Sequence, residues 1–249
     1  MAVRDRSGIE SLPLDRLVPV LGPGEALAVV APAGIVATAL APARRALPPD
    51  ETARIARFRQ PQDRLEREAA HGLLRHLLGG LLGRPPAGLV LVRDAFGRPA
   101  LPDARDLDLN LSHGAGWVAA ALARGGRIGV DVEGAARPVD WDALGPHFLH
   151  PAELAEFRAL PAGARPRRAL EIWAVKEACL KASGEGLSAV PETVRLVPDG
   201  AAWRLDHRGL RLRAASLVLG DGARFAWSGE AHLDVRVVGA PGVADAAGD

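Results

Sequence analysis

The sequence predicts an α+β protein built from two similar halves, each a mainly antiparallel sheet packed on one long helix. Two stretches, Gln62–Leu82 and Arg168–Ser183, carry apolar residues at the spacing of a helix. Shorter stretches around each helix alternate apolar and polar residues, as half-buried strands do. The order strand, helix, strands therefore runs through residues 1–125 and again through residues 126–238, and we expect a disordered tail at residues 239–249.

The first half opens with an irregular segment and then two short stretches of small and β-branched residues. Ala26–Ala31 and Ile35–Ala39 predict the strands of a hairpin that turns at Pro32–Gly34. Prolines followed by an acidic residue at Pro48–Asp50 are typical of a helix N-terminus, so we expect a helix from there to about Phe58.

The long helix of the first half has an apolar stripe and a polar stripe. The apolar stripe, expected to face the core, comprises Leu65, Ala69, Leu73, Leu77 and Leu81. The polar stripe comprises Arg64, Arg67, His71 and Arg75. We expect a solvated face for most of these arginines and a structural role for His71. The strands that complete the half are expected at Leu89–Arg93, Asp108–Ser112 and Trp117–Ala123.

The second half begins with the strand Arg127–Glu133. We expect a short helix near Pro151, a loop over Leu160–Arg167, and then the long helix, which glycine ends at Gly184. Alternating residues after it predict antiparallel strands at Thr193–Val197, Ala202–Leu205, Leu210–Ala215 and Arg224–Val238.

Composition argues against several classes of function. The net charge of +1 and the absence of tyrosine give no sign of a nucleic-acid partner. No apolar stretch is long enough to span a bilayer and residues 1–15 do not resemble a signal peptide, so we expect a cytoplasmic protein without a membrane partner. The single cysteine, Cys179, excludes an internal disulfide and is expected to be a small core residue.

Lysine is confined to one segment of the chain. Lysine and arginine total 31 residues, yet the only lysines are Lys176 and Lys181, both in the long helix of the second half. Lysine is a compact charge on a flexible stem and suits phosphate oxygens that move during a reaction. The spacing i, i+3, i+4 and i+8 predicts one helix face for Trp173, Lys176, Glu177 and Lys181, with Trp173 packed behind it.

Two carboxylates share one face of the first strand of the second half. Because side chains alternate along a strand, Asp131 and Glu133 point to one side, and Val130 and Val132 to the other. Adjacent carboxylates raise each other's pKa, and a hard divalent cation with oxygen ligands removes that cost. If the helix face with Glu177 meets this strand, the cluster can support Mg²⁺-assisted transfer at a phosphate or diphosphate. The alternative for the strand alone is a solvated edge face.

Two turns of the first half are candidate ligand contacts. Ser112 and His113 end a strand and precede Gly-Ala-Gly, whose open backbone allows close approach of a phosphate. Gly97, Arg98 and Pro99 form the other turn, and an ordinary polar turn is the alternative for both. The sequence contains no phosphate-binding loop, dinucleotide fingerprint, nucleophile elbow or zinc motif of the common types.

Taken together and in this order, the motifs resemble those of the 4′-phosphopantetheinyl transferases, specifically the large Sfp-type group. They are Phe-Gly-Arg-Pro at Phe96–Pro99, Asn-Leu-Ser-His at Asn110–His113, Ile-Gly-Val-Asp-Val-Glu at Ile128–Glu133 and Trp-x-x-Lys-Glu-Ala-x-x-Lys at Trp173–Lys181. The last two are specific as a pair, and the resemblance covers roughly residues 47–187.

The resemblance implies a pseudodimer with its active site in the cleft between the halves. Such enzymes move the phosphopantetheine arm of coenzyme A onto a serine of an acyl or peptidyl carrier protein and release 3′,5′-ADP. Carried over by motif, Mg²⁺ would be held by Asp131, Glu133 and Glu177. The diphosphate would be contacted by Lys176 and Lys181, and catalysis would rest on Asp131, Glu177 and Lys181. The 3′-phosphate would be held by Ser112, His113 and Arg54, and the adenine bordered by Gly97, Arg98 and Pro99.

The chain departs from the family pattern at three positions. Gly114 stands where a second serine is common, His71 where arginine or another polar residue is common, and Arg98 where lysine is common. None of these changes removes a metal ligand. Glu177 is expected to act as a metal ligand or as the base for the serine, and the sequence leaves both roles open.

Two other functions stay open from the sequence. One is an inactive module that binds coenzyme A or a carrier protein, although binding alone does not need three clustered carboxylates. The other is a Mg²⁺-dependent phosphohydrolase that uses the same carboxylates. We expect a monomer, and the basic segment Arg158–Arg168 is a candidate docking patch for an acidic carrier helix.

Overall fold

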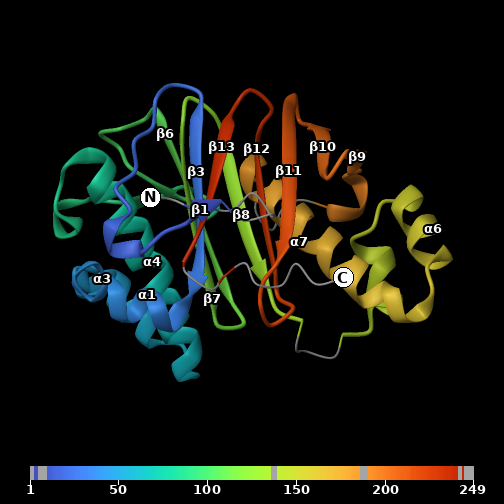
Figure 1. Ribbon diagram of the computed structural model, residues 1–249, viewed down its shortest axis with the longest axis horizontal. Helices are drawn as coiled ribbons and strands as arrows, with labels where there is room; N and C mark the ends of the chain where they lie inside the picture. The colour runs from blue at the N-terminus through green and yellow to red at the C-terminus, as the bar shows by residue number, and fades with distance from the viewer. Residues whose placement is uncertain (1–2, 5–9, 136–138, 186–189, 241–242, 244–249) are drawn as a thin grey trace.

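In the computed structural model, two sheets run through the middle of the molecule between two long helices (Figure 1). The structure describes residues 3–4, 10–135, 139–185, 190–240 and 243. The first sheet has the order β1-β2-β13-β3-β7-β6 (Val3–Arg4, Glu10–Ser11, Asp234–Gly239, Glu25–Pro32, Trp117–Arg124 and Leu107–Gly114). The second has the order β8-β12-β11-β10-β9 (Ile128–Glu133, Arg224–Glu230, Leu210–Val218, Ala202–His207 and Val197–Asp199). A small ribbon pairs β4 (Val92–Arg93) with β5 (Pro99–Ala100).

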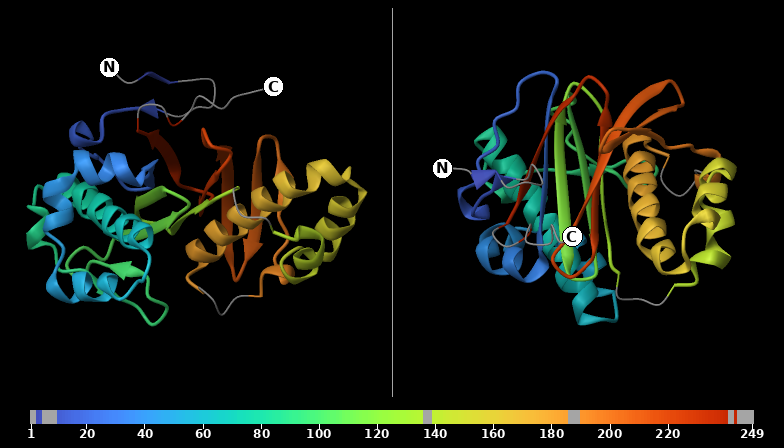
Figure 2. Two further views of the ribbon diagram at one scale, coloured as in Figure 1. Left: turned by 90° about the horizontal axis from the view of Figure 1, so that it is seen from below. Right: turned by 45° about the vertical axis from the view of Figure 1, so that its right-hand side comes forward.

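The helices divide between the two sheets (Figure 2). Those beside the first sheet are α1 (Ala33–Ala39), α2 (Ala41–Arg45), α3 (Pro49–Ala56) and α4 (Pro61–Leu82). Those beside the second are α5 (Trp141–Leu144), α6 (Pro151–Ala159) and α7 (Arg165–Ser183). The predicted α+β fold of two sheet-and-helix halves is therefore confirmed. No helix in the described part of the chain has the length and apolar character needed to cross a membrane.

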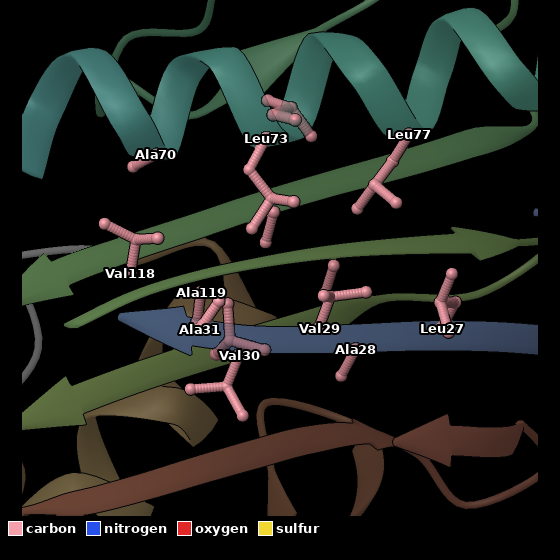
Figure 3. Packing of buried hydrophobic residues seen from close by; sticks show 14 of the residues in the cluster. Leu27, Ala28, Val29, Val30, Ala31, Ala70, Leu73, Leu77, Val118 and Ala119 are labelled. Atoms are coloured by element: carbon pink, nitrogen blue, oxygen red, sulfur yellow. The ribbon is translucent and has the colours of Figure 1, made fainter. Parts of the chain in front are cut away.

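Helix α4 forms the core of the first half with β3 and β7. Leu73 and Leu77 are fully buried and point toward the strand that carries Leu27 and Val29 (Figure 3). The facing stretch of β7 is rich in alanine, so the helix can approach the sheet closely. The predicted apolar stripe is thus confirmed at its centre, while its end residues Leu65 and Leu81 are only partly buried.

The predicted hairpin at the start of the first half is wrong in its second strand. Residues 35–39 belong to helix α1, which begins directly after β3, and the amide of Ala33 donates to the carbonyl of Gly116 (2.8 Å). Val36 is fully buried against the core under α4. Packing onto α4 overrides the strand tendency of the β-branched residues, because tertiary contacts outweigh local propensity. The partners of β3 are instead β7 and, in parallel, β13.

Helix α7 lies directly on β8 and β12 in the second half. The two elements touch at Gly129, where an added Cβ would stand 2.1 Å from the carbonyl oxygen of Ala178. Glycine is therefore required for this approach, which brings the α7 side chains over the carboxylates of β8. The helix ends as predicted at Gly184, whose φ of 82° lies in the left-handed region.

The two halves meet where the edge strands β6 and β8 lie side by side. Alternate side chains of β6 accept hydrogen bonds from alternate amides of β8: Asp108 from Ile128 (2.8 Å), Asn110 from Val130 (2.9 Å) and Ser112 from Val132 (3.4 Å). The ladder satisfies amides that have no strand partner on that side. It fixes the register of the carboxylate strand against the first half.

The predicted boundary at residues 125 and 126 does not follow the sheets throughout. Strand β13 comes from the second half of the sequence, yet it pairs with β2 and β3 of the first sheet. The stretch predicted as one strand, Arg224–Val238, is therefore two strands in different sheets. The segment predicted as strand Thr193–Val197 contains the end of a 3₁₀ turn and only the first residue of β9. Most of the predicted tail lies outside the described residues.

Candidate active site

Three side chains, one each from β6, β8 and α7, meet beside the junction of the halves. Asp131 of β8 lies 2.6 Å from the ammonium of Lys181 of α7, measured from Oδ1 to Nζ. The same ammonium donates to Ser112 Oγ of β6 (3.0 Å), and that hydroxyl donates to Asp131 Oδ1 (2.9 Å). The predicted convergence of the strand and helix motifs is therefore found for Asp131 and Lys181, and Ser112 joins them.

Two carboxylates of this cluster, Glu133 and Glu177, have raised pKa values. Burial, and then the charge of Asp131, raise the pKa of Glu133 to about 7, and the same two causes raise the pKa of Glu177. Glu133 and Glu177 therefore resist ionisation beside the charge of Asp131, because clustered acids repel each other. The three predicted carboxylates lie close enough to interact strongly.

The carboxylate cluster fits a hard divalent cation. Asp131 Oδ2 is buried and has no hydrogen-bond partner, so this oxygen is available to a ligand. The available donors are carboxylate oxygens, the type that Mg²⁺ prefers, and a cation would relieve their repulsion. Within the described ranges, however, no three His, Cys, Asp or Glu side chains already form a complete metal-binding group.

Lys176 lies elsewhere, which corrects the prediction of one shared helix face. Its ammonium is completely buried, 2.7 Å from Glu153 Oε2, and donates to backbone carbonyls on the far side of α7. Five residues separate it from Lys181, which corresponds to about 140° around a helix axis. The structure therefore brings one of the two predicted ammonium groups to the carboxylates and directs the other away.

A pocket of about 220 Å³ opens beside the carboxylate cluster. Glu177 and Lys181 line it on the α7 side, and the β4–β5 turn, predicted as a ligand contact, lines it on the other. The lining comprises Arg93, Phe96, Gly97, Arg98, Pro99, Asn110, Leu111, Glu177, Leu180, Lys181 and Gly184. The turn and the catalytic motif of the second half therefore share one cavity.

Arg98 holds the pocket together and is not a free ligand group. Its guanidinium is buried and bonds to the carboxylate of Asp108 and to the main-chain carbonyls of Ile128 and Lys181. These contacts tie the β4–β5 turn to β6, β8 and α7. Gly97 has a φ of 83°, a conformation that favours glycine and that leaves the backbone beside the pocket open.

A basic region of the first half lies beside this pocket. Arg93 lines the pocket, and burial lowers its pKa. The nearby positive charges of Arg54 and Arg67 lower this pKa further. Burial, Arg67 and Lys181 lower the pKa of His113 to about 3. His113 is therefore neutral at physiological pH, in a strongly positive environment that favours an anion.

The polar stripe of α4 is buried at His71 and Arg75, contrary to the expected solvated face, whereas Arg64 and Arg67 are only partly buried. Arg75 is 1% exposed, and its guanidinium bonds to Glu51 of α3 at 3.1 Å. His71 is buried as well, 2.9 Å from the other oxygen of Glu51, which agrees with its predicted structural role. Arg54 lies 3.7 Å from Glu51 but remains 43% exposed in its side chain.

Sequence reasoning missed several contributors to the site. Arg93 and Leu180 belong to the pocket, and Trp173 donates its indole N–H to Glu133 Oε1 (2.9 Å). The indole bond could have been suspected from the position of Trp173 one turn before Glu177. Arg93 offered no signal, because one arginine among many in a basic segment is not distinctive. Cys179 is a buried core residue, as predicted.

Comparison with known proteins agrees with these motifs. The profile of the 4′-phosphopantetheinyl transferase superfamily matches residues 127–236, and the profile of a 4′-phosphopantetheinyl transferase N-terminal domain matches residues 36–124. Among solved structures, the holo-[acyl-carrier-protein] synthase (AcpS) of Thermotoga maritima has 18% identity and a TM-score of 0.34 over 42% of this chain and 62% of its own.

Curated relatives include several transferases. The 4′-phosphopantetheinyl transferase HetI of Nostoc sp. is 34% identical over 61% of this chain and 66% of its own length. A Synechocystis sp. protein assigned to the same enzyme class is 31% identical over 65% of this chain and 71% of its own. The 4′-phosphopantetheinyl transferase Sfp of Bacillus subtilis is 28% identical over 63% and 75%. The match spans about half (55%) of the psf-1 transferase of Bacillus pumilus. The chain belongs to the 4′-phosphopantetheinyl transferase superfamily.

Proposed function

We propose that this protein transfers the 4′-phosphopantetheine arm of coenzyme A to a serine of an apo carrier protein, with Mg²⁺ as cofactor and 3′,5′-ADP as the second product. The observation that carries the proposal is the cluster of Asp131, Glu133, Glu177 and Lys181. Two members of this cluster, Glu177 and Lys181, line a pocket between the two halves. Family membership supports the same reaction.

The carboxylates have a defined task in this reaction. Asp131, Glu133 and Glu177 would hold Mg²⁺, which when bound neutralises charge on the diphosphate. The buried oxygen Asp131 Oδ2 is free to serve as a ligand, and Trp173 orients Glu133 through its indole N–H. Two carboxylates with raised pKa values give up their protons more readily once a cation lies beside them.

Lys181 would stabilise the leaving group. Its ammonium lies on the pocket wall, and its partners in this structure are Asp131, Ser112 and the carbonyl of Val130. A phosphate beside it would gain a charge-assisted hydrogen bond as negative charge develops. Ser112 supports Lys181 and Asp131 from β6, so we assign it this orienting role as well as the proposed contact to phosphate.

Glu177 would serve as the base for the carrier serine. In the part of the chain that the structure describes, no hydrogen bond to its carboxylate is formed, whereas Asp131 accepts two and Glu133 accepts one. Its raised pKa makes the ionised form a better proton acceptor than an ordinary glutamate. One oxygen can face the metal while the other accepts the serine proton.

The first half would bind the nucleotide part of coenzyme A. The turn Gly97–Pro99 would border the adenine, because its open backbone lies in the pocket beside Glu177. The 3′-phosphate would be received by Arg54 and Arg93, which together line a neighbouring cavity, and by His113, whose surroundings are electropositive. Lys176 is withdrawn from the diphosphate contacts, since its ammonium is buried on another face of α7.

The carrier protein is proposed to dock near Arg158–Arg168. This segment connects α6 to the start of α7, and Arg158 and Arg167 are exposed there. Arg165 and Arg168 already pair with Asp142 and Glu171. An acidic carrier helix would find complementary charge at the exposed pair. We further propose that the protein acts as a cytoplasmic monomer with no nucleic-acid or membrane partner.

The test is to incubate the protein with coenzyme A, Mg²⁺ and a panel of apo carrier proteins, and to weigh the carriers. A mass gain of one phosphopantetheine arm per carrier, with equimolar 3′,5′-ADP, supports transfer. Release of 3′,5′-ADP without a carrier would point to a phosphohydrolase. Mg²⁺-dependent binding of coenzyme A with no product on any carrier would point to a binding module.

A further inference from the structure

The buried ammonium of Lys176 uses all of its hydrogen-bonding capacity inside the protein. It lies 2.7 Å from Glu153 Oε2 and donates to the carbonyls of Phe148 (2.7 Å), Pro191 (2.9 Å) and Val194 (2.7 Å). Lysine offers three N–H donors, so four acceptors leave none for a ligand. The residue is 0% exposed, which keeps any phosphate out of reach.

Both carboxylate oxygens of Glu153, the partner of Lys176, also accept hydrogen bonds from the protein. Glu153 stands in the first turn of α6, where its Oε2 accepts from the amide of His150 (2.9 Å) and its Oε1 from the amide of Leu196 (2.7 Å). The pair therefore joins α7 to the turn before α6 and to the segment that leads into β9. A buried pair with every oxygen and hydrogen engaged holds these segments in one arrangement.

A chain of contacts runs from this pair to the carboxylate cluster. Lys176 fixes the backbone of Phe148, and the Phe148 ring packs edge-on against Trp173, with centroids 5.4 Å apart and planes at 89°. The Trp173 indole N–H in turn donates to Glu133 Oε1 (2.9 Å). An edge-to-face contact fixes ring orientation, so the position of Phe148 determines where the indole N–H points.

We infer that Lys176 is a positioning residue that orients Glu133 for Mg²⁺ through Phe148 and Trp173, and that it does not contact the diphosphate. The inference rests on the proposed function, because it concerns the cation that this function requires. Partners behind a metal ligand commonly change metal affinity by about 10–100-fold when they are removed.

The two lysines of α7 provide a matched pair of variants. Lys176→Met keeps the length of the side chain and removes its charge, and Lys181→Met does the same at the pocket. Calorimetry measures the affinity of each protein for Mg²⁺ and, separately, for coenzyme A in the presence of EDTA. We expect Lys176→Met to weaken Mg²⁺ binding about tenfold and to leave metal-free coenzyme A binding unchanged, and Lys181→Met to weaken metal-free coenzyme A binding.

Two further variants keep the test decisive if Lys176→Met fails to fold. Glu153→Gln combined with Lys176→Met removes both buried charges, which proteins often tolerate. Phe148→Leu leaves the ion pair intact and removes only the ring that holds Trp173. Both should weaken Mg²⁺ binding, the second by less.

The outcomes separate this inference from the proposed function. A folded Lys176→Met protein with wild-type Mg²⁺ affinity would overturn the inference, as would a loss of metal-free coenzyme A binding equal to that of Lys181→Met. A Phe148→Leu protein with wild-type Mg²⁺ affinity would show that the contact between Phe148 and Trp173 does not position Glu133. If the wild-type protein bound no Mg²⁺ and modified no carrier, the proposed function itself would fail.

Discussion

The two halves of the molecule contain the same internal ion pair built from different residues. In the first half Arg75 of α4 bonds to Glu51 in the first turn of α3, and in the second half Lys176 of α7 pairs with Glu153 in the first turn of α6. Both cations are buried, and both also donate to carbonyls of the segment after their helix: Pro86 and Leu89 in one half, Pro191 and Val194 in the other. The repeat is visible in space although the residue types differ.

The surroundings of the two ion pairs differ, and the two halves therefore offer different groups to a ligand. Glu51 also lies near His71, Arg93 and Arg54, so the first pair belongs to a region rich in cations. The second pair connects through aromatic rings to a cluster of carboxylates. In the proposed reaction, the first half would therefore bind phosphate directly, and the second would bind the cation that receives phosphate. A diphosphate-containing substrate between them would contact both.

The largest effect is expected from removing a carboxylate of the second half. Asp131→Ala should lower the rate of carrier modification by about 10²–10³-fold or more, because Asp131 would hold the metal and it anchors Lys181. The rate is measured as holo-carrier formed per minute by mass spectrometry. Asp106→Asn, at an exposed residue paired with Arg124, serves as the control. A wild-type rate in Asp131→Ala would exclude the assigned metal site.

The two ion pairs can be compared directly by their contribution to stability. Breaking a buried pair costs about 3–5 kcal/mol when one charge is left without a partner. Lys176→Met should reach this range, since Lys176 is the cation paired with Glu153 within the described structure. Arg75→Met should cost less, because His71 and Arg93 remain near Glu51. Urea unfolding of both variants measures the difference, and a larger loss for Arg75→Met would contradict the comparison.

Gly129→Ala tests how closely α7 must approach the carboxylate strand. The new Cβ would clash with the carbonyl oxygen of Ala178, so the helix must move away from β8. We expect a loss of about 1–3 kcal/mol from overpacking, together with reduced transfer, because Glu177 and Lys181 move with the helix. Gly163→Ala is the control, since an added Cβ there meets no atom within 4 Å. Equal stability and activity in both variants would refute the requirement.

The acids of the two halves are expected to change stability with pH in opposite directions. Burial alone would raise the pKa of Glu51, but His71 and Arg75 lower it to about 2, so its stabilising contribution is present above its unfolded pKa of 4.5 and is lost as pH falls through about 2. The raised pKa of Glu133, about 7, acts in the other direction: in the metal-free protein, stability falls as pH rises from 4.5 through about 7.

Thermal unfolding in EDTA across this pH range measures both effects. Mg²⁺ should restore the stability lost near pH 7, because it favours ionised carboxylates. A Glu133→Gln protein should lose much of the decline near pH 7 while keeping the acid transition of Glu51. If the decline in stability near pH 7 is unchanged in Glu133→Gln, a group other than Glu133 causes that decline.

The motifs that carry chemistry were predictable because their geometry is local. Alternation along one strand places Asp131 and Glu133 on the same face, and a spacing of four residues places Glu177 beside Lys181. The predicted position of Lys176 was wrong because a helical wheel gives the angles between residues but does not show which face of the helix contacts the sheet. Its burial depends on Glu153, a residue distant in sequence whose position only the packing of α6 on α7 determines.

Long-range pairing accounts for the other differences. The pairing of β13 with β3 joins segments at opposite ends of the sequence, and alternation alone does not identify a strand's partner. Residues 35–39 look like a strand in isolation and become α1 because Val36 packs into the core beneath α4. The buried arginine Arg75 resembled a surface residue because its partner Glu51 belongs to the preceding helix.

The most direct test of the account is the mass of an apo carrier protein after incubation with coenzyme A and this protein, with Mg²⁺ or with EDTA. We expect the carrier to gain one phosphopantetheine arm with Mg²⁺ and the gain to disappear with EDTA, and we expect Asp131→Ala to slow the Mg²⁺-dependent gain by about 10²–10³-fold. A full gain in EDTA would contradict the metal-dependent carboxylate site. No gain on any carrier, by a folded protein that binds coenzyme A, would contradict the transfer reaction itself.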